Sequence, residues 1–129
     1  MTSDPKPIDP GAAIGSVHLK VADLERAVRF YRDALGFSVQ GRIGDSAAFL
    51  SAGGYHHHVG ANTWAGEGAP RPPVGALGLR SYEVVVPEAS ELDSLERRLA
   101  AAGADVHRDD GVLHSSDPSG MTVRAAVSA

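Results

Sequence analysis

The chain has 129 residues, the usual size of one domain, a formal net charge of −4 and no cysteine. Its 43% hydrophobic and 22% charged residues are typical of a globular protein. The acidic balance and the scattered Lys and Arg residues argue against a nucleic-acid partner. Without cysteine there is no disulfide framework and no thiolate metal site, so any bound metal must use His, Asp or Glu.

The N-terminal segment is expected to be flexible over residues 1–13. Its first ten residues carry three prolines and three charged side chains, unlike the apolar core of a signal peptide. No apolar run reaches the roughly 18 residues that a membrane helix needs. We therefore expect a cytoplasmic protein that does not enter a membrane.

Residues 14–64 are expected to form a first module of one strand, one helix and three further strands. Asp23 is a candidate N-cap for a helix through Leu35, because an apolar stripe repeats at helical spacing. Gly36 then ends the helix. The predicted strands cover residues 14–21, 37–43, 47–52 and 55–64.

The same order of elements recurs over residues 79–127, after a Pro- and Gly-rich linker at 65–78. A strand at 79–86 precedes a helix that Ser90 and Asp93 are expected to open as a capping box and that Gly103 ends. Three strands follow, at residues 105–108, 112–116 and 122–127. The repeat has a constant offset, since Gly36 to Gly103 and Val39 to Val106 both span 67 residues.

These patterns predict an α+β fold made of two βαβββ modules in a single domain over residues 14–127. One four-stranded sheet with one helix leaves its second face bare, so the two modules are expected to pack together. With the helices outside, the sheets would form an open curled barrel whose inner face surrounds a pocket.

Three sequence motifs carry a family resemblance: HLKVADLERAVRFY at residues 18–31, LGF at 35–37 and DPSG at 117–120. They resemble the vicinal oxygen chelate superfamily, which includes glyoxalases, bleomycin resistance proteins and extradiol dioxygenases. A narrower motif, GYHHHVGANTW at residues 54–64, resembles the branch of catechol 2,3-dioxygenase-like proteins.

The resemblance implies four inward positions, on the first and last strands of each module, where metal-binding relatives place their ligands. His18 occupies the first position, and His58 or His56 the second. Ser81 stands where dioxygenase-like relatives carry His, and Arg124 where relatives usually carry Glu. Serine is a weak ligand and arginine binds no cation, so at most His18 and His58 would hold a metal. A divalent metal cofactor is thus possible but disfavoured.

The run His56-His57-His58 is the sharpest local feature. Strand alternation would send His56 and His58 to one face and His57 to the other. The resemblance implies an acid–base histidine near this strand, so His57 or His58 is a candidate catalytic residue. The alternative is that these side chains only form hydrogen bonds that shape a polar pocket.

Further pocket candidates are Lys20, Glu83 and Trp64. Lys20 and Glu83 would pair across the barrel, or Glu83 would replace Ser81 as a metal ligand. Arg124 on an inner face requires an anionic partner, either Glu83 or an acidic ligand. Trp64 is either a wall for a flat ligand or part of the core.

Two functions remain open at this point. The first is a metal-free protein that binds or sequesters an aromatic or natural-product-like small molecule, as bleomycin resistance proteins do; the substituted ligand positions favour it. The second is a metal-dependent extradiol dioxygenase, lyase or isomerase, which the histidines favour. In either case we expect a homodimer, because the sheet edges and barrel mouths need cover.

Overall fold

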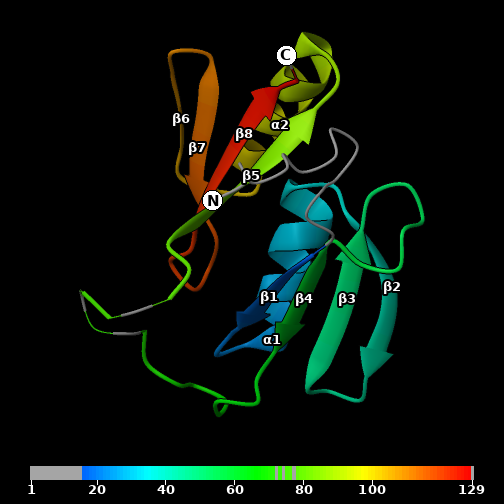
Figure 1. The fold of residues 1–129 in the computed structure, drawn as a ribbon, viewed down its shortest axis with the longest axis vertical. Helices are drawn as coiled ribbons and strands as arrows, with labels where there is room; N and C mark the ends of the chain where they lie inside the picture. The colour runs from blue at the N-terminus through cyan, green and yellow to red at the C-terminus, as the bar shows by residue number, and fades with distance from the viewer. Residues whose placement is uncertain (1–15, 72, 74, 77, 129) are drawn as a thin grey trace, which may run out of the picture.

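The computed structural model describes residues 16–71, 73, 75, 76 and 78–128, and it contains the two expected βαβββ modules (Figure 1). The expected flexible segment 1–13, the start of the first predicted strand and parts of the linker lie outside the described residues. The α+β fold is confirmed, with two sheets that do not close into a barrel. The elements are β1 (Val17–Lys20), α1 (Leu24–Arg29), η1 (Phe30–Ala34), β2 (Ser38–Ile43), β3 (Ala47–Ser51), β4 (Val59–Asn62), β5 (Ser81–Val86), α2 (Ala89–Ala101), β6 (Val106–Asp109), β7 (Val112–Ser116) and β8 (Thr122–Val127).

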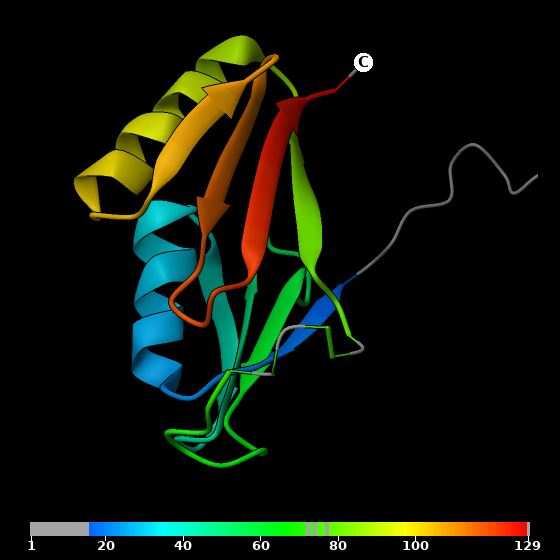
Figure 2. The same cartoon turned by 90° about the vertical axis from the view of Figure 1, so that its left-hand side faces the viewer.

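Each module folds into one four-stranded sheet with the same topology. The strand orders are β1-β4-β3-β2 and β5-β8-β7-β6, and in both sheets the first strand of the module pairs in parallel with the last. Both helices lie on the same side of the two sheets (Figure 2). The opposite faces of the sheets are not covered by helices, and the candidate site residues lie there.

One hydrophobic core joins the helices to the faces of both sheets that the helices cover. Its largest fully buried apolar side chains come from both modules: Tyr31, Leu50, Leu92, Leu99, Leu113 and Val28. The helix stripes predicted from the sequence are part of this core. No helix in the described part of the chain is long and apolar enough to cross a membrane.

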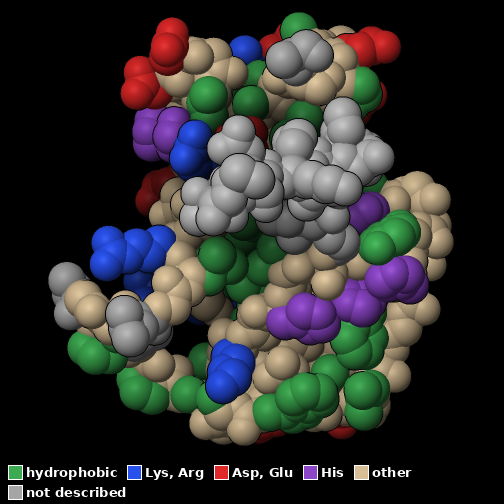
Figure 3. Space-filling model, viewed as in Figure 1, with side chains coloured by type: hydrophobic (Ala, Val, Ile, Leu, Met, Phe, Trp, Pro, Cys, Tyr) green, Lys and Arg blue, Asp and Glu red, His purple; other side chains and the backbone are tan. Residues whose placement is uncertain are grey.

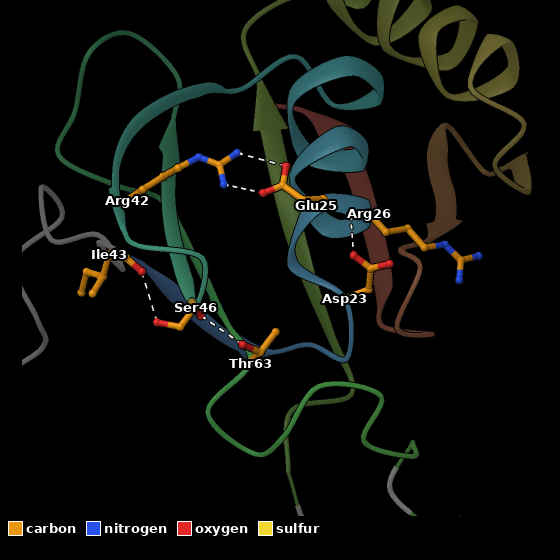
Figure 4. Close-up of polar contacts among 7 residues, drawn as sticks. All are labelled: Asp23, Glu25, Arg26, Arg42, Ile43, Ser46 and Thr63. Carbon is orange, nitrogen blue, oxygen red and sulfur yellow. Dashed lines mark hydrogen bonds and ion pairs between the residues drawn. The ribbon is translucent and has the colours of Figure 1, made fainter.

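The first helix begins and ends as predicted. The Asp23 carboxylate accepts a hydrogen bond from the Arg26 backbone N–H at 3.1 Å (Figure 4). The last turn is a π-helix, because the Leu35 N–H donates to the Phe30 carbonyl, five residues back. Gly36 follows with a φ of +86°, a left-handed conformation that glycine adopts without strain.

We expect Asp23→Ala to lower the free energy of unfolding by about 1 kcal/mol, because the N-cap hydrogen bond is lost. The matched control is Ser90→Ala near the start of α2, where the Ser90 hydroxyl lies 3.4 Å from the Glu88 carboxylate and caps no backbone group. Urea unfolding of both variants measures the difference. Equal losses would contradict the assignment of Asp23 as the helix cap.

The capping box predicted for the second helix is wrong. The N-cap of α2 is Glu88, and no side chain bonds the first free N–H groups. Ser90 already lies within the first helical turn, so its backbone has helical geometry and its hydroxyl turns to the Glu88 side chain instead. The predicted closing glycine is confirmed: Gly103 has a φ of +78°.

The strand predicted over residues 55–64 is too long, and this error affects the site. β4 begins only at Val59, so the three histidines lie in the loop before it. Gly53 and Gly54, with φ values of +68° and +78°, turn the chain out of β3, and the Ser51 hydroxyl donates to the Tyr55 carbonyl across the loop. The face assignment by strand alternation therefore does not apply to the histidines.

The two modules exchange hydrogen bonds at their contact. The Tyr31 hydroxyl at the end of the first helix donates to the buried Asp117 carboxylate in the turn before β8, at 2.7 Å. In the other direction, the Arg98 guanidinium of α2 donates to the Ala34 and Leu35 carbonyls, at 3.3 Å each. Each module thus satisfies polar groups of the other.

Candidate functional site

Three imidazoles meet on the open face of the first sheet, and we call His18, His56 and His57 the imidazole cluster. The Nε2 atoms of His18 and His57 lie 3.4 Å apart, and their rings meet edge to face with centroids 5.1 Å apart. The Nδ1 atoms of His56 and His57 lie 3.1 Å apart. Histidine side chains form a band across this face (Figure 3).

The sheet register makes room for the His18 ring. Parallel pairing of β1 and β4 places His18 opposite Gly60. A Cβ atom at position 60 would lie 3.0 Å from His18 Nδ1, tighter than nearly all real contacts. The inward position on the last strand of this module is therefore a glycine, and neither His56 nor His58 occupies it.

The environment of His57 favours its neutral form. Burial lowers the pKa of His57, and the neighbouring imidazoles of His56, His18 and His58 lower the pKa further. A neutral imidazole keeps one nitrogen lone pair free. His57 can therefore accept a proton or a metal bond at neutral pH.

His58 has a local structural role instead. Its Nδ1 accepts the Ala52 backbone N–H at 3.1 Å, and its ring stacks on Tyr55 with centroids 4.6 Å apart. Of the two histidines predicted as catalytic, the structure brings His57 to His18 and ties His58 into the loop. The proposed His18–His58 metal pair is not formed in this arrangement.

Sequence reasoning missed two neighbours of the cluster. The Ser16 hydroxyl lies 3.3 Å from His18 Nε2, and the Phe49 ring lies beside His57 with centroids 5.1 Å apart. The alternation of β3 contained the signal for Phe49, because its neighbours Ala48 and Leu50 are buried in the core and Phe49 must point the other way.

The second sheet carries an ion pair where the resemblance implied metal ligands. Glu83 and Arg124 are direct partners in the β5–β8 ladder, and their charged groups lie 3.5 Å apart. Both side chains are more than 40% exposed, so the burial cost expected for Arg124 does not arise. Among the described residues Glu83 pairs with Arg124, and the predicted Lys20–Glu83 pair is absent. Ser81 lies opposite Thr122 in the same ladder.

Trp64, a predicted pocket residue, lies apart from the imidazole cluster, and so do His107 and His114 of the second sheet. Trp64 is 64% exposed and donates its indole N–H to the Ser46 hydroxyl at 3.2 Å, so it is not part of the core. His107 and His114 stack on each other across β6 and β7, with centroids 4.9 Å apart and rings 7° from parallel.

The residues present do not fit a complete metal site within one chain. Fe(II) sites of the oxygenase type use two histidines and one carboxylate on one face of the metal. His18 and His57 offer the imidazoles, but over residues 16–128, apart from 72, 74 and 77, no group of three or more His, Asp or Glu side chains is placed to hold a metal. Glu83, the carboxylate predicted as a possible metal ligand in place of Ser81, instead forms an ion pair with Arg124.

Comparison with known proteins identifies the family. The family model described as the Glyoxalase/Bleomycin resistance protein/Dioxygenase superfamily matches residues 13–123. The chain belongs to this superfamily, as its sequence motifs and its paired βαβββ modules indicate.

One curated relative is considerably more similar than the solved structures are. The catechol-2,3-dioxygenase of Bacillus subtilis (strain 168) is 47% identical over 106 residues, which is 81% of this chain but only 37% of the relative. The chain thus spans little more than a third of that enzyme.

Solved structures share the fold at low identity. A glyoxylase/bleomycin resistance protein/dioxygenase domain from Frankia sp. EAN1pec has a TM-score of 0.72 at 24% identity, over 92% of this chain and 93% of the other. The lactoylglutathione lyase of Agrobacterium tumefaciens has a TM-score of 0.65 at 24% identity, over 92% and 96%. The fosfomycin resistance protein of Mesorhizobium loti has a TM-score of 0.65 at 12% identity, over 91% and 92%.

Proposed function

We propose that this chain is a domain of a catechol-cleaving dioxygenase and contributes the imidazole cluster to the active site. The observation that carries the proposal is the 3.4 Å approach of His57 Nε2 to His18 Nε2 on the open sheet face. The 47% identity to a catechol-2,3-dioxygenase supports the choice of reaction. This favours the enzymatic alternative over the metal-free binding protein.

His57 is the candidate acid–base residue of this site. Its lowered pKa keeps the ring neutral, so Nε2 or Nδ1 can accept the proton of a catechol hydroxyl. The Phe49 ring beside it offers an apolar surface for the flat substrate. His18 would help to hold a ferrous ion once the remaining ligands are supplied, and that ion would supply the activation of the diol and O₂.

The missing ligands must then come from outside this copy of the domain. The described residues hold no group of three or more His, Asp or Glu side chains placed to bind a metal, and the chain matches only 37% of the length of the curated relative. A second domain or a second copy of the chain would complete the ligand set. The homodimer expected from the uncovered sheet edges and barrel mouths would then become part of the proposed active site.

The test compares His18→Ala with His114→Ala. Untagged protein is mixed with Fe(II) and catechol in air, and formation of the yellow ring-opened semialdehyde is followed by absorbance. We expect His18→Ala to lower the rate at least 100-fold, the scale of losing a catalytic group. His114→Ala is the matched control, because that imidazole stacks on His107 in the other sheet, and it should stay within about twofold of wild type.

Two further readouts sharpen the result. Because the proposed site needs a second copy, the activity per chain should rise with protein concentration, and light scattering should show a dimer where activity saturates. Absence of ring-opened product from the wild type at all protein and Fe(II) concentrations would exclude the proposed function, as would equal activity of the His18→Ala variant.

A second candidate is a metal-free protein that binds an aromatic small molecule. The Glu83–Arg124 ion pair favours it, because it occupies the part of the second sheet where metal ligands were expected. Stoichiometric binding of an aromatic ligand by metal-free protein, with no gain on adding Fe(II), would support this candidate over the dioxygenase.

A further inference from the structure

A cleft with a strongly cationic lining opens next to the imidazole cluster. Its volume is about 830 Å³, and it lies between the end of β1, the start of α1, the linker and the turn before β8. Clefts of roughly 300 to 1,000 Å³ are typical of small-molecule sites. His18 lines this cleft and also belongs to the imidazole cluster.

Four basic side chains from separate segments line the cleft: Lys20, Arg26, Arg71 and Arg80. The whole chain has a formal net charge of −4, so this gathering of positive charge is not an effect of composition. Figure 3 shows Lys and Arg side chains on either side of a hollow at the lower left of this face. Such an arrangement attracts anions, because the charges add in one small volume.

None of these four cations has an ion-pair partner among the described residues, since no carboxylate there lies within 4 Å of any of them. Away from the cleft, Arg32, Arg42, Arg108 and Arg124 each pair with a carboxylate.

The cleft also contains two acidic residues, but both are engaged in their own hydrogen bonds. Asp23 caps α1, and Asp117 accepts from the Tyr31 hydroxyl and from the Ser119 and Met121 backbone N–H groups. Neither side chain neutralises the four cations by direct pairing.

Arg71 is held in place by the turn before β8. Its guanidinium lies 3.5 Å from the Pro118 carbonyl and rests directly over Gly120. A Cβ atom at position 120 would lie 3.0 Å from the guanidinium carbon, and Gly120 has a φ of +85°. Glycine suits this turn because its φ is positive, and the absence of a Cβ leaves room for the Arg71 guanidinium.

We infer that the cleft binds the carboxylate of the substrate, so that the substrate is an aromatic diol with an acidic substituent. The inference rests on the proposed dioxygenase function for the diol part. The diol would lie at His18 and His57, and the carboxylate would be bound by the arginines on the cleft side of His18. Paired N–H donors of arginine match the two oxygens of a carboxylate.

The test is a calorimetric titration with two probes that differ only in the acidic group, 3,4-dihydroxybenzoate and catechol. We expect wild-type protein to bind 3,4-dihydroxybenzoate at least tenfold more tightly than catechol, with the ratio falling as salt is raised. Arg71→Gln should bring the ratio to within about threefold, since one charge-assisted contact is lost. Arg97→Gln on the exposed face of α2 is the matched control and should leave the ratio unchanged.

Equal binding of the two probes by the wild type, or no binding of either, would overturn the inference, and so would an unchanged ratio in Arg71→Gln. Should that variant fail to fold, Arg80→Gln provides the same comparison.

Failure of this inference can be distinguished from failure of the proposed dioxygenase function. If the protein cleaves catechol but does not bind 3,4-dihydroxybenzoate more tightly, the dioxygenase proposal stands and the anion-site inference fails. If the protein binds 3,4-dihydroxybenzoate tightly but forms no ring-opened product, the anion site stands and the dioxygenase proposal fails.

Discussion

Replacing Asp117 by alanine is expected to lower the free energy of unfolding by about 3 kcal/mol or more, because each buried donor left without a partner costs about 1–3 kcal/mol. The Asp117 carboxylate is only 5% exposed and accepts three hydrogen bonds, from the Tyr31 hydroxyl at 2.7 Å and from the Ser119 and Met121 N–H groups at 2.8 Å each. Alanine would leave three donors without a partner.

Urea unfolding with matched controls measures this loss. Asp117→Asn keeps a carbonyl oxygen for the two backbone N–H groups and should lose less than the alanine variant. Asp105→Ala, at an exposed position before β6, should change the free energy of unfolding by less than about 0.5 kcal/mol. A loss below 1 kcal/mol for Asp117→Ala would mean that the contact between the modules does not depend on this carboxylate.

Alkaline pH is the second condition with a large expected effect. Burial is the largest cause that raises the pKa values of Tyr31 and Tyr82, and the charge of the Asp117 carboxylate also raises both, while the neighbouring Tyr31 hydroxyl partly lowers the pKa of Tyr82. In the unfolded chain both hydroxyls titrate near pH 10. The folded state holds these protons more tightly, so the stabilisation is complete below pH 10 and is lost as the pH rises above it. The expected slope is about 1.4 kcal/mol per pH unit for each tyrosine, or about 2.7 kcal/mol for both.

Tyr82→Phe separates the two contributions. The Tyr82 hydroxyl is buried and has no hydrogen-bond partner among the described residues, so its removal should not destabilise the protein at neutral pH. Above pH 10 the loss of stability per pH unit should fall by half. An unchanged slope in Tyr82→Phe would contradict the prediction.

Much of the fold was predictable because it follows from short-range patterns. The predicted strands 112–116 and 122–127 agree with β7 and β8, and Asp23, Gly36 and Gly103 begin or end the helices as expected. These signals depend on local backbone chemistry, namely caps, left-handed glycines and alternating burial. Duplication of the motif at a fixed offset added evidence that one module alone would not provide.

The candidate site was less predictable, because it depends on where loops return in space. His18 was identified from its strand, but its partner is His57 rather than His58, since the histidines lie in a loop without strand alternation. The cationic cleft was missed apart from Lys20 and His18. Arg26, Arg71 and Arg80 belong to a helix, the linker and the residue before β5, and no spacing along the chain relates them.

The glycine opposite His18 has a consequence for how the site can change. The ring rests against the peptide backbone of β4, and a backbone wall has no rotamers to exchange. The pairing of two strands thereby limits where the His18 ring can lie on one side, while His57 of the loop contacts it on another. Variation in the loop before β4 can therefore alter what surrounds the imidazole while its contact with the β4 backbone is kept. The strands β1 and β4 thus provide the constant part of the site, and the loop before β4 and the linker provide the part that can vary in sequence.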